Sequence, residues 1–105
     1  MTIYIAKDFT IKPGPRTIKE GNDSGELFLN KILRAAFKNS LAEKEILVVN
    51  LDNTAGYATS FLEESFGGLQ RENPKLKLEE HMKFISHDEP YLLDEIQEYI
   101  TNARS

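Results

Sequence analysis

The feature that most constrains the fold is an apolar run that leads through a turn into an amphipathic segment. Residues Ile46–Val49 are continuously apolar, and residues 50–68 carry small, polar and spaced apolar side chains before ending at two glycines. A short apolar run bounded by turn residues is typical of a buried strand, and the spacing after it indicates a helix. We therefore predict a strand over 45–51 that leads to a helix with a Ser/Thr pair in its first turn. In α/β domains such junctions commonly hold binding or regulated groups.

The rest of the chain alternates between strand-like and helix-like patterns. Further strands are predicted at 3–5, 9–11 and 82–86, and helices from about Asp23 or Ser24 to Asn39, Ser60 to Leu69 and Pro90 to Asn102. Residues 75–81 fit either a short helix or an ordered loop. The order is β-β-α-β-α-β-α. We therefore expect an α/β sandwich with a mixed four-stranded sheet, partly parallel, and right-handed crossovers.

Local signals set the expected ends of these helices. Asp23 and Glu26 have the spacing of a capping box at the start of the first helix. Gly67 and Gly68 supply the backbone freedom that the end of the second helix needs. Within that second helix, Gln70 is expected to face outward. The inward positions are expected to be Leu62, Ser65, Phe66 and Leu69.

The composition excludes several classes of protein. At 105 residues the chain has the size of one domain, and its 40% apolar residues suffice for one core. It has no cysteine, which excludes disulfides, thiolate metal sites and thiol catalysis. Lysine and arginine are scattered and the net charge is −4, which disfavours nucleic-acid binding. Because neither a signal peptide nor roughly eighteen successive apolar residues are evident, we expect a cytoplasmic protein without a membrane span.

Ser60 is the first candidate for a functional group. With Glu63 it fits a capping box, in which its hydroxyl would accept a hydrogen bond from a free backbone N–H. The alternative is a phosphorylation site, because a helix N-terminus offers free N–H groups and a positive dipole to a phosphate. About two added negative charges beside Glu63, Glu64 and Asp52 would repel an acidic partner surface. The residues themselves leave both interpretations open.

Three short segments carry a resemblance to a known family. They are residues 24–28 (SGELF), 56–64 (GYATSFLEE) and 66–69 (FGGL). They resemble the bacterial STAS-like domains of unknown function, a family related in layout to the STAS domains of anti-sigma-factor antagonists. The resemblance implies a STAS-like fold and a regulatory protein-interaction role. The implied partner is a histidine-kinase-like ATPase or an anti-sigma-type protein.

The same resemblance assigns a possible regulated residue. STAS antagonists carry an Asp-Ser-Ser-Gly-Leu motif at this junction, and a kinase of the histidine-kinase-like ATPase class phosphorylates its second serine. Laid on that motif, residues 58–62 put Ser60 at the phosphorylated position and Thr59 before it. The motif aspartate is replaced by Ala58, and the motif glycine by Phe61.

A second candidate is the loop that follows the apolar run. Residues 50–54 superficially match the Asp-x-Asp-x-Thr signature of haloacid-dehalogenase-type phosphatases, whose first aspartate is the nucleophile. Here the first position is Asn50, and an amide cannot serve. Asp52, Asn53 and Thr54 could instead form a small-ligand or enzyme site at the strand end. The other interpretation is that Asp52 caps the turn by accepting a hydrogen bond from its own backbone.

A third candidate is the outer face of the second helix. Neighbouring helical rows are expected to carry Ser60, Glu63, Glu64 and Gly67, with Tyr57 just upstream. A solvated face explains the two glutamates. A partner-binding face is favoured by the bordering tyrosine, because tyrosine is enriched where interfaces are strongest.

The two histidines do not predict a metal site. His81 and His87 flank the strand expected at 82–86 and have acidic neighbours, but their spacing does not enforce three or four converging ligands. We expect no metal, no cofactor and no catalytic residue. The sequence therefore favours a non-enzymatic, STAS-like interaction domain that Ser60 could regulate. The alternative is a small-ligand-binding or phosphatase-like protein that uses Asp52.

Overall fold

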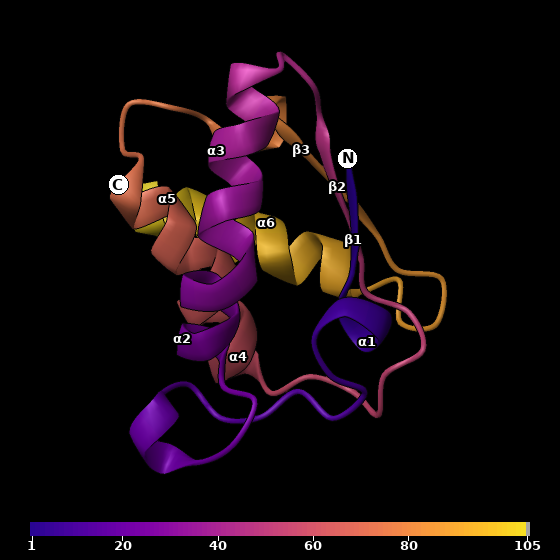
Figure 1. Cartoon of the computed structure of the whole chain (residues 1–105). Coiled ribbons are helices and arrows are strands. Elements are labelled where there is room, and N and C mark those ends of the chain that lie inside the picture. Colours follow the sequence, from indigo (N-terminus) through magenta and orange to yellow (C-terminus); the bar gives the residue numbers. More distant parts are fainter. Residues whose placement is uncertain (105) are drawn as a thin grey trace.

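A three-stranded parallel sheet organises the computed structural model, which describes residues 1–104 (Figure 1). Its strands are β1 (Thr2–Tyr4), β2 (Leu47–Asn50) and β3 (Met82–Ile85). The helical elements are α1 (Ile5–Asp8), η1 (Ile18–Glu20), α2 (Gly25–Phe28), η2 (Leu29–Leu33), α3 (Arg34–Ala42), α4 (Thr59–Leu62), η3 (Glu63–Gly67), α5 (Gly68–Glu72), η4 (Leu78–Glu80) and α6 (Leu92–Arg104). Strands and helices alternate from β1 onward, as predicted for an α/β sandwich.

The strand order is β1-β2-β3, with Thr2 opposite Val48 and Val48 opposite Lys83. When parallel strands follow one another in a single direction, right-handed crossovers place the connecting helices on the same face of the sheet. Figure 1 shows both long helical segments on one side of the strands. The fold is therefore a sheet with a helical layer on one face, and α6 completes that layer by packing against η3 and α5.

The predicted mixed four-stranded sheet is wrong within the described residues, because residues 9–11 do not form a strand. After β1 the chain turns at once into α1, and the Phe9 ring packs against the rings of Phe28 and Phe61, 5.3 and 6.4 Å away. An aromatic side chain buries far more apolar area in such a cluster than at a solvated sheet edge. The apolar character of this segment therefore reflects core packing.

Two long helices form the crossovers, and each contains one π-helical turn. Residues 25–42 comprise α2, η2 and α3, and residues 59–72 comprise α4, η3 and α5. A Cβ added to Gly25 would lie 2.6 Å from the carbonyl oxygen of Phe61, so the two backbones nearly touch where the helices meet. The Ser65 hydroxyl also lies at this crossing, 3.3 Å from the carbonyl oxygen of Gly25 on the other helix and 2.8 Å from the Phe61 carbonyl oxygen of its own helix.

Several helix ends differ from the prediction. The first long helix is capped by Ser24, one of the two predicted starts, whose hydroxyl accepts from the N–H of Leu27 at 3.0 Å, so the capping box of Asp23 and Glu26 is wrong. The second helix begins one residue early and runs through both glycines to Glu72, so the predicted glycine cap is wrong. The η3 π turn carries the helix past Gly67 without a break. The ambiguous segment 75–81 contains η4, a single 3-10 turn.

The inward face predicted for the second helix is confirmed, because Leu62, Ser65, Phe66 and Leu69 are all fully buried. Gln70, which we expected to face outward, is fully buried as well. Its amide nitrogen donates to the carbonyl oxygens of Asn73 and Leu76 at 2.9 and 2.8 Å. The side chain therefore holds the connection to β3 in place.

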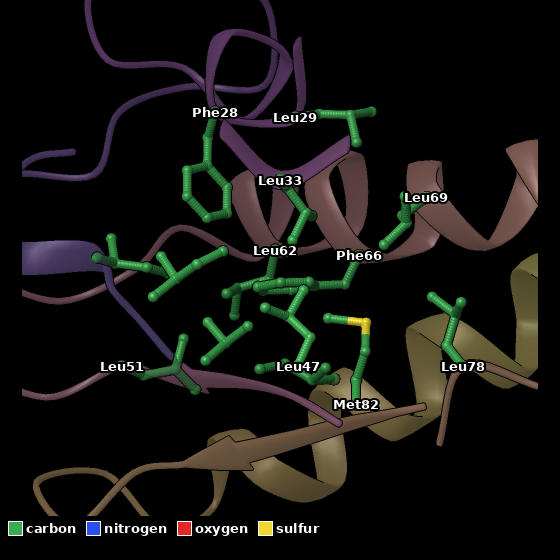
Figure 2. Packing of buried hydrophobic residues seen from close by; sticks show 14 of the residues in the cluster. Phe28, Leu29, Leu33, Leu47, Leu51, Leu62, Phe66, Leu69, Leu78 and Met82 are labelled. Carbon is green, nitrogen blue, oxygen red and sulfur yellow. The ribbon is translucent and has the colours of Figure 1, made fainter. Parts of the chain in front are cut away.

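The hydrophobic core lies between the sheet and the helical layer, as Figure 2 shows. Its largest fully buried side chains include Phe28, Phe37, Phe61 and Phe66. The Phe66 ring meets the ring of Phe84 edge-on at 4.9 Å, which joins the second helix to β3. This packing fixes the position at which residues 50–60 leave the sheet.

Candidate functional site

The loop after β2 is held by its own side chains and by the loop after β3. The Asn50 side chain accepts from the N–H of Asp52 at 2.9 Å. The Asp52 carboxylate accepts from the backbone N–H groups of His87 and Asp88 at 2.7 and 2.9 Å. The Asp88 carboxylate accepts in turn from the N–H of Asn53 at 2.9 Å. The two carboxylates therefore tie together the loops that leave two neighbouring strands.

The turn-capping role expected of Asp52 falls to Asn50, two residues earlier. Asp52 is only 10% exposed at its side chain, and its second oxygen lies 3.2 Å from Nδ1 of the exposed His87. Hydrogen bonds from backbone N–H groups to an ionised carboxylate are stronger than those between neutral groups. Of the strand-end residues predicted, Asp52 forms the link, Asn53 takes a positive φ of 69°, and Thr54 accepts from the N–H of Gly56 at 3.3 Å.

Tyr57 anchors the next part of the loop. Its hydroxyl donates to the carbonyl oxygen of Leu51 at 2.8 Å, and its ring packs 5.8 Å from the ring of Phe61. Burial raises the pKa of Tyr57 to about 12. The side chain is therefore a neutral donor at physiological pH. It braces the approach to the helix and is only partly available to a partner.

The second long helix begins without a side-chain cap. Ala58 occupies the N-cap position with an extended backbone (φ −73°, ψ 144°) and has no hydroxyl or carboxylate to offer. The capping box predicted for Ser60 and Glu63 is therefore wrong, because Ser60 lies inside the first turn. Ala58 and Thr59 are exposed and Ser60 is half-buried. The first N–H groups of the helix have no side-chain cap, and they lie beside two hydroxyl groups.

The two hydroxyl groups differ in their surroundings. Thr59 shares a hydrogen bond with the phenol of Tyr99, whose pKa is raised by burial and by the nearby carboxylates of Glu95 and Glu98. Among the described residues, no side-chain hydrogen bond of Ser60 is present. Ser60 is therefore the less engaged of the two, and Thr59 is the one that contacts α6.

The glutamates predicted on the outer face form an ion-pair network, with arginines that the sequence did not indicate. Nη1 of Arg16 donates to Glu63 at 2.6 Å and to Glu64 at 3.1 Å. Arg71 donates to the other oxygen of Glu63 at 2.6 Å. The hydrogen bond from Arg71 is the largest cause of the lowered pKa of Glu63, and Arg16 lowers it further.

Gly67 does not belong to an exposed stripe. It is buried beneath this network, and a Cβ there would lie 2.5 Å from the Oε2 of Glu63. Of the predicted partner face, the structure gathers Ser60, Glu63 and Glu64 on the start of one helix. It places Tyr57 just before them. Arg16 was missed because it comes from a loop 47 positions away along the chain, and no local pattern marks it.

The described residues form no group of three or more potential metal ligands. His81 packs edge-on against the Phe37 ring at 6.4 Å, at the opposite end of the strand from His87. This region can present to another molecule backbone N–H donors without a side-chain cap, the half-buried hydroxyl of Ser60 and acidic side chains. Within residues 1–104 no helix combines the length and apolar character that crossing a membrane requires.

Comparison with known proteins gives one match. Residues 24–92 match the family described as a STAS-like domain of unknown function (DUF4325). The matched segment begins at the cap of α2 and includes both long helices, β2, β3 and Ser60. No curated protein and no solved structure matches the chain. Because the match covers more than half of the 105 residues, the chain belongs to the family of STAS-like domains of unknown function.

Proposed function

We propose that this chain is a regulatory protein-interaction domain whose docking face surrounds the start of the second long helix. The face comprises Tyr57, Thr59, Ser60, Glu63 and Glu64. The observation that carries the proposal is the uncapped helix start, where Ala58 and Thr59 are exposed and Ser60 is half-buried, at the carboxyl end of a parallel sheet. In α/β folds that edge commonly holds binding groups.

The chemistry of this turn suits regulation by phosphate. A phosphoryl group on Ser60 would meet the positive end of the helix and its unpaired N–H groups. It would also add about two negative charges close to Glu63 and Glu64, which pair with Arg16 and Arg71. The modification therefore changes the charge of the docking face without any change in fold.

The proposed partner class rests on the resemblance of this chain to the STAS domains of anti-sigma-factor antagonists. We propose a histidine-kinase-like ATPase or an anti-sigma-type protein that docks when Ser60 is unmodified. Such a partner would bring its own catalytic groups. The domain itself would contribute a surface and the hydroxyl that is modified.

The alternative, a small-ligand or phosphatase-like site at Asp52, receives less support from the geometry. One oxygen of the Asp52 carboxylate is engaged by two backbone N–H groups, and the other lies beside His87. The position that a phosphatase nucleophile would take is held by Asn50, whose amide closes the turn. We therefore propose that Asp52 is structural, so that Asp52→Asn destabilises the two loops and removes no catalytic activity.

The experiment recovers the tagged chain from its own cells and analyses the Ser60 peptide and the co-purified proteins by mass spectrometry. Ser60→Ala and Ser60→Asp variants are compared with Thr101→Asp, which places the same charge on an exposed position of α6. We expect an ATP-binding partner with the wild type and Ser60→Ala, and at least about tenfold less with Ser60→Asp.

Two results would contradict the proposal. Equal recovery with Ser60→Asp and Thr101→Asp would show that the helix start is not the docking face. The regulatory role would also be contradicted if Ser60 stayed unmodified and no stoichiometric partner were found across growth conditions. That result would favour the alternative site at Asp52.

A further inference from the structure

Within residues 1–104, one face of the sheet has no helical layer. Side chains alternate between the two faces of a strand, so the buried Ile3, Leu47 and Val49 face the helices while their neighbours face away. The strand register places the outward neighbours side by side across the three strands. This open sheet face comprises Thr2, Tyr4, Ile46, Val48, Asn50, Lys83 and Ile85.

The exposure of the open sheet face is unusual for a parallel sheet. Tyr4 and Ile46 are 47% and 48% exposed, and Val48 and Ile85 are only half-buried although they lie within the sheet. Parallel sheets are ordinarily covered on both faces, because their strands connect through helices. Here the single direction of the strand order sends both crossovers to one side (Figure 1). The chain therefore leaves an apolar, unpartnered surface on the other side.

The size of this face indicates what could cover it. Three strands spaced about 4.8 Å apart, of which β1 has three residues and β2 and β3 have four, form a patch of at most roughly 14 by 13 Å. That is on the order of 200 Å², well below the roughly 800 Å² per partner of a stable protein–protein interface, so a second copy is a poor match. One helix with its side chains is about 10–12 Å wide, which fits three strands.

Two further features restrict the kind of molecule that can bind the open sheet face. Strand addition at the β1 edge is obstructed, because the N–H of Tyr4 already donates to the Asp8 carboxylate at 2.8 Å. Lys83 is exposed on the open sheet face and forms no ion pair within residues 1–104. An otherwise uncharged face with one free cation is complementary to an apolar surface that carries a carboxylate.

We propose that the open sheet face binds one amphipathic helix of a partner protein, with an apolar stripe across β1–β3 and an acidic side chain beside Lys83. The contact uses a surface distinct from the start of the second long helix and does not rest on Ser60. Because the buried area is small, the helix adds weak affinity of its own and orients a partner that is also held elsewhere.

The test titrates the isotopically labelled full chain with a synthetic helical peptide and follows the backbone amide signals by NMR. The peptide is about 14 residues long, with leucines at i, i+3, i+4 and i+7 and flanking glutamates. Two control peptides carry lysine in place of glutamate, or the same residues in scrambled order. We expect shifts confined to Thr2, Tyr4, Val48 and Lys83 and their neighbours, and none with the scrambled peptide.

Variants of the chain distinguish specific docking of the peptide from non-specific binding. Tyr4→Asp, at an exposed position that does not endanger folding, should weaken binding about tenfold, whereas Ile18→Asp, at a similarly exposed residue of η1, should not. Lys83→Glu should reverse the preference between the glutamate and lysine peptides.

Shifts that avoid the open sheet face, or an unchanged preference in Lys83→Glu, would overturn the proposal. So would a chain that dimerises on its own in sedimentation equilibrium and becomes monomeric in Tyr4→Asp, because the occupant would then be a second copy.

Discussion

The starts of the two long helices have nearly the same backbone and opposite surroundings. Ser24 caps the first with φ −72° and ψ 163°, and Ala58 precedes the second with φ −73° and ψ 144°. Ser24 is fully buried and its hydroxyl accepts from Leu27. Ala58 is exposed and offers no side-chain acceptor. The two helices meet at Gly25 and Phe61 but begin in opposite ways. The start of the first is capped and buried, whereas the start of the second, the open end, is uncapped and exposed at Ala58.

The difference separates a structural helix start from one that is available to a partner. A buried helix end must satisfy its free N–H groups within the protein, and Ser24 does so. An exposed end can leave them to water or to an incoming group. The chain places its open end beside Ser60 and the acidic residues of η3. We therefore take the open end as the one suited to docking.

The largest expected effect comes from breaking the crossing that both helices share. Phe61→Ala removes a fully buried ring that packs against Phe9, Phe28 and Tyr57. We expect a loss of about 3–5 kcal/mol in the free energy of unfolding, measured with urea. Tyr91→Ala, at a 56% exposed ring, is the control and should change little. A loss below about 1 kcal/mol for Phe61→Ala would mean that the crossing does not hold the layer together.

The second prediction compares the two serines directly. Ser24→Ala removes a buried cap and should cost about 1 kcal/mol of unfolding free energy. Ser60→Ala removes a hydroxyl that caps nothing and should change stability by less than about 0.5 kcal/mol. Thermal and urea unfolding of both variants, under identical conditions, measure the difference. Equal costs would show that Ser60 has a structural role after all.

The third prediction concerns a side-chain cap added at the open end. Because Ala58 already has the backbone conformation of a cap, Ala58→Ser should stabilise the chain by roughly 0.5–1 kcal/mol. If the helix start is the docking face, the same variant should also weaken binding of the partner, because the new serine hydroxyl accepts from the free N–H groups. Stabilisation without any effect on binding would place the partner elsewhere.

The smallest effect concerns pH. The hydrogen bond from Arg71, with a contribution from Arg16, lowers the pKa of Glu63 in the folded chain. Its contribution to stability is therefore present above the ordinary glutamate pKa and is lost as pH falls through the folded value. Arg71→Gln should reduce the loss of stability between neutral and acid pH, measured as the shift in urea midpoint. Identical pH profiles for the two proteins would contradict this role.

Much of the fold could be predicted from local patterns. The apolar run at 46–49 indicated the central strand, and helical spacing indicated the inward face of the second long helix. The strand predicted at 9–11 was wrong because its apolar and aromatic pattern fits both a short strand and a loop that inserts Phe9 into the core. Gly67 and Gly68 misled for a related reason, since glycine permits both a helix end and close packing inside a helix.

The candidate site was predicted only in part. The sequence singled out Ser60, Glu63, Glu64 and Asp52, and the family match includes all of them. It gave no sign that Arg16 pairs with the glutamates, or that Asp52 binds the loop after β3. Both contacts join residues more than thirty positions apart, and no local spacing encodes them.

By itself, the sequence determined the family, the order of the strands and helices from 45 onward, and the position of a hydroxyl pair at a helix start. Local backbone preference and apolar spacing suffice for those features. Only the tertiary structure decided that the sheet is parallel and covered on one face, that Ala58 leaves its helix uncapped, and that Arg16 neutralises Glu63. These features depend on which distant segments come into contact, and burial and charge pairing act only after that contact has formed.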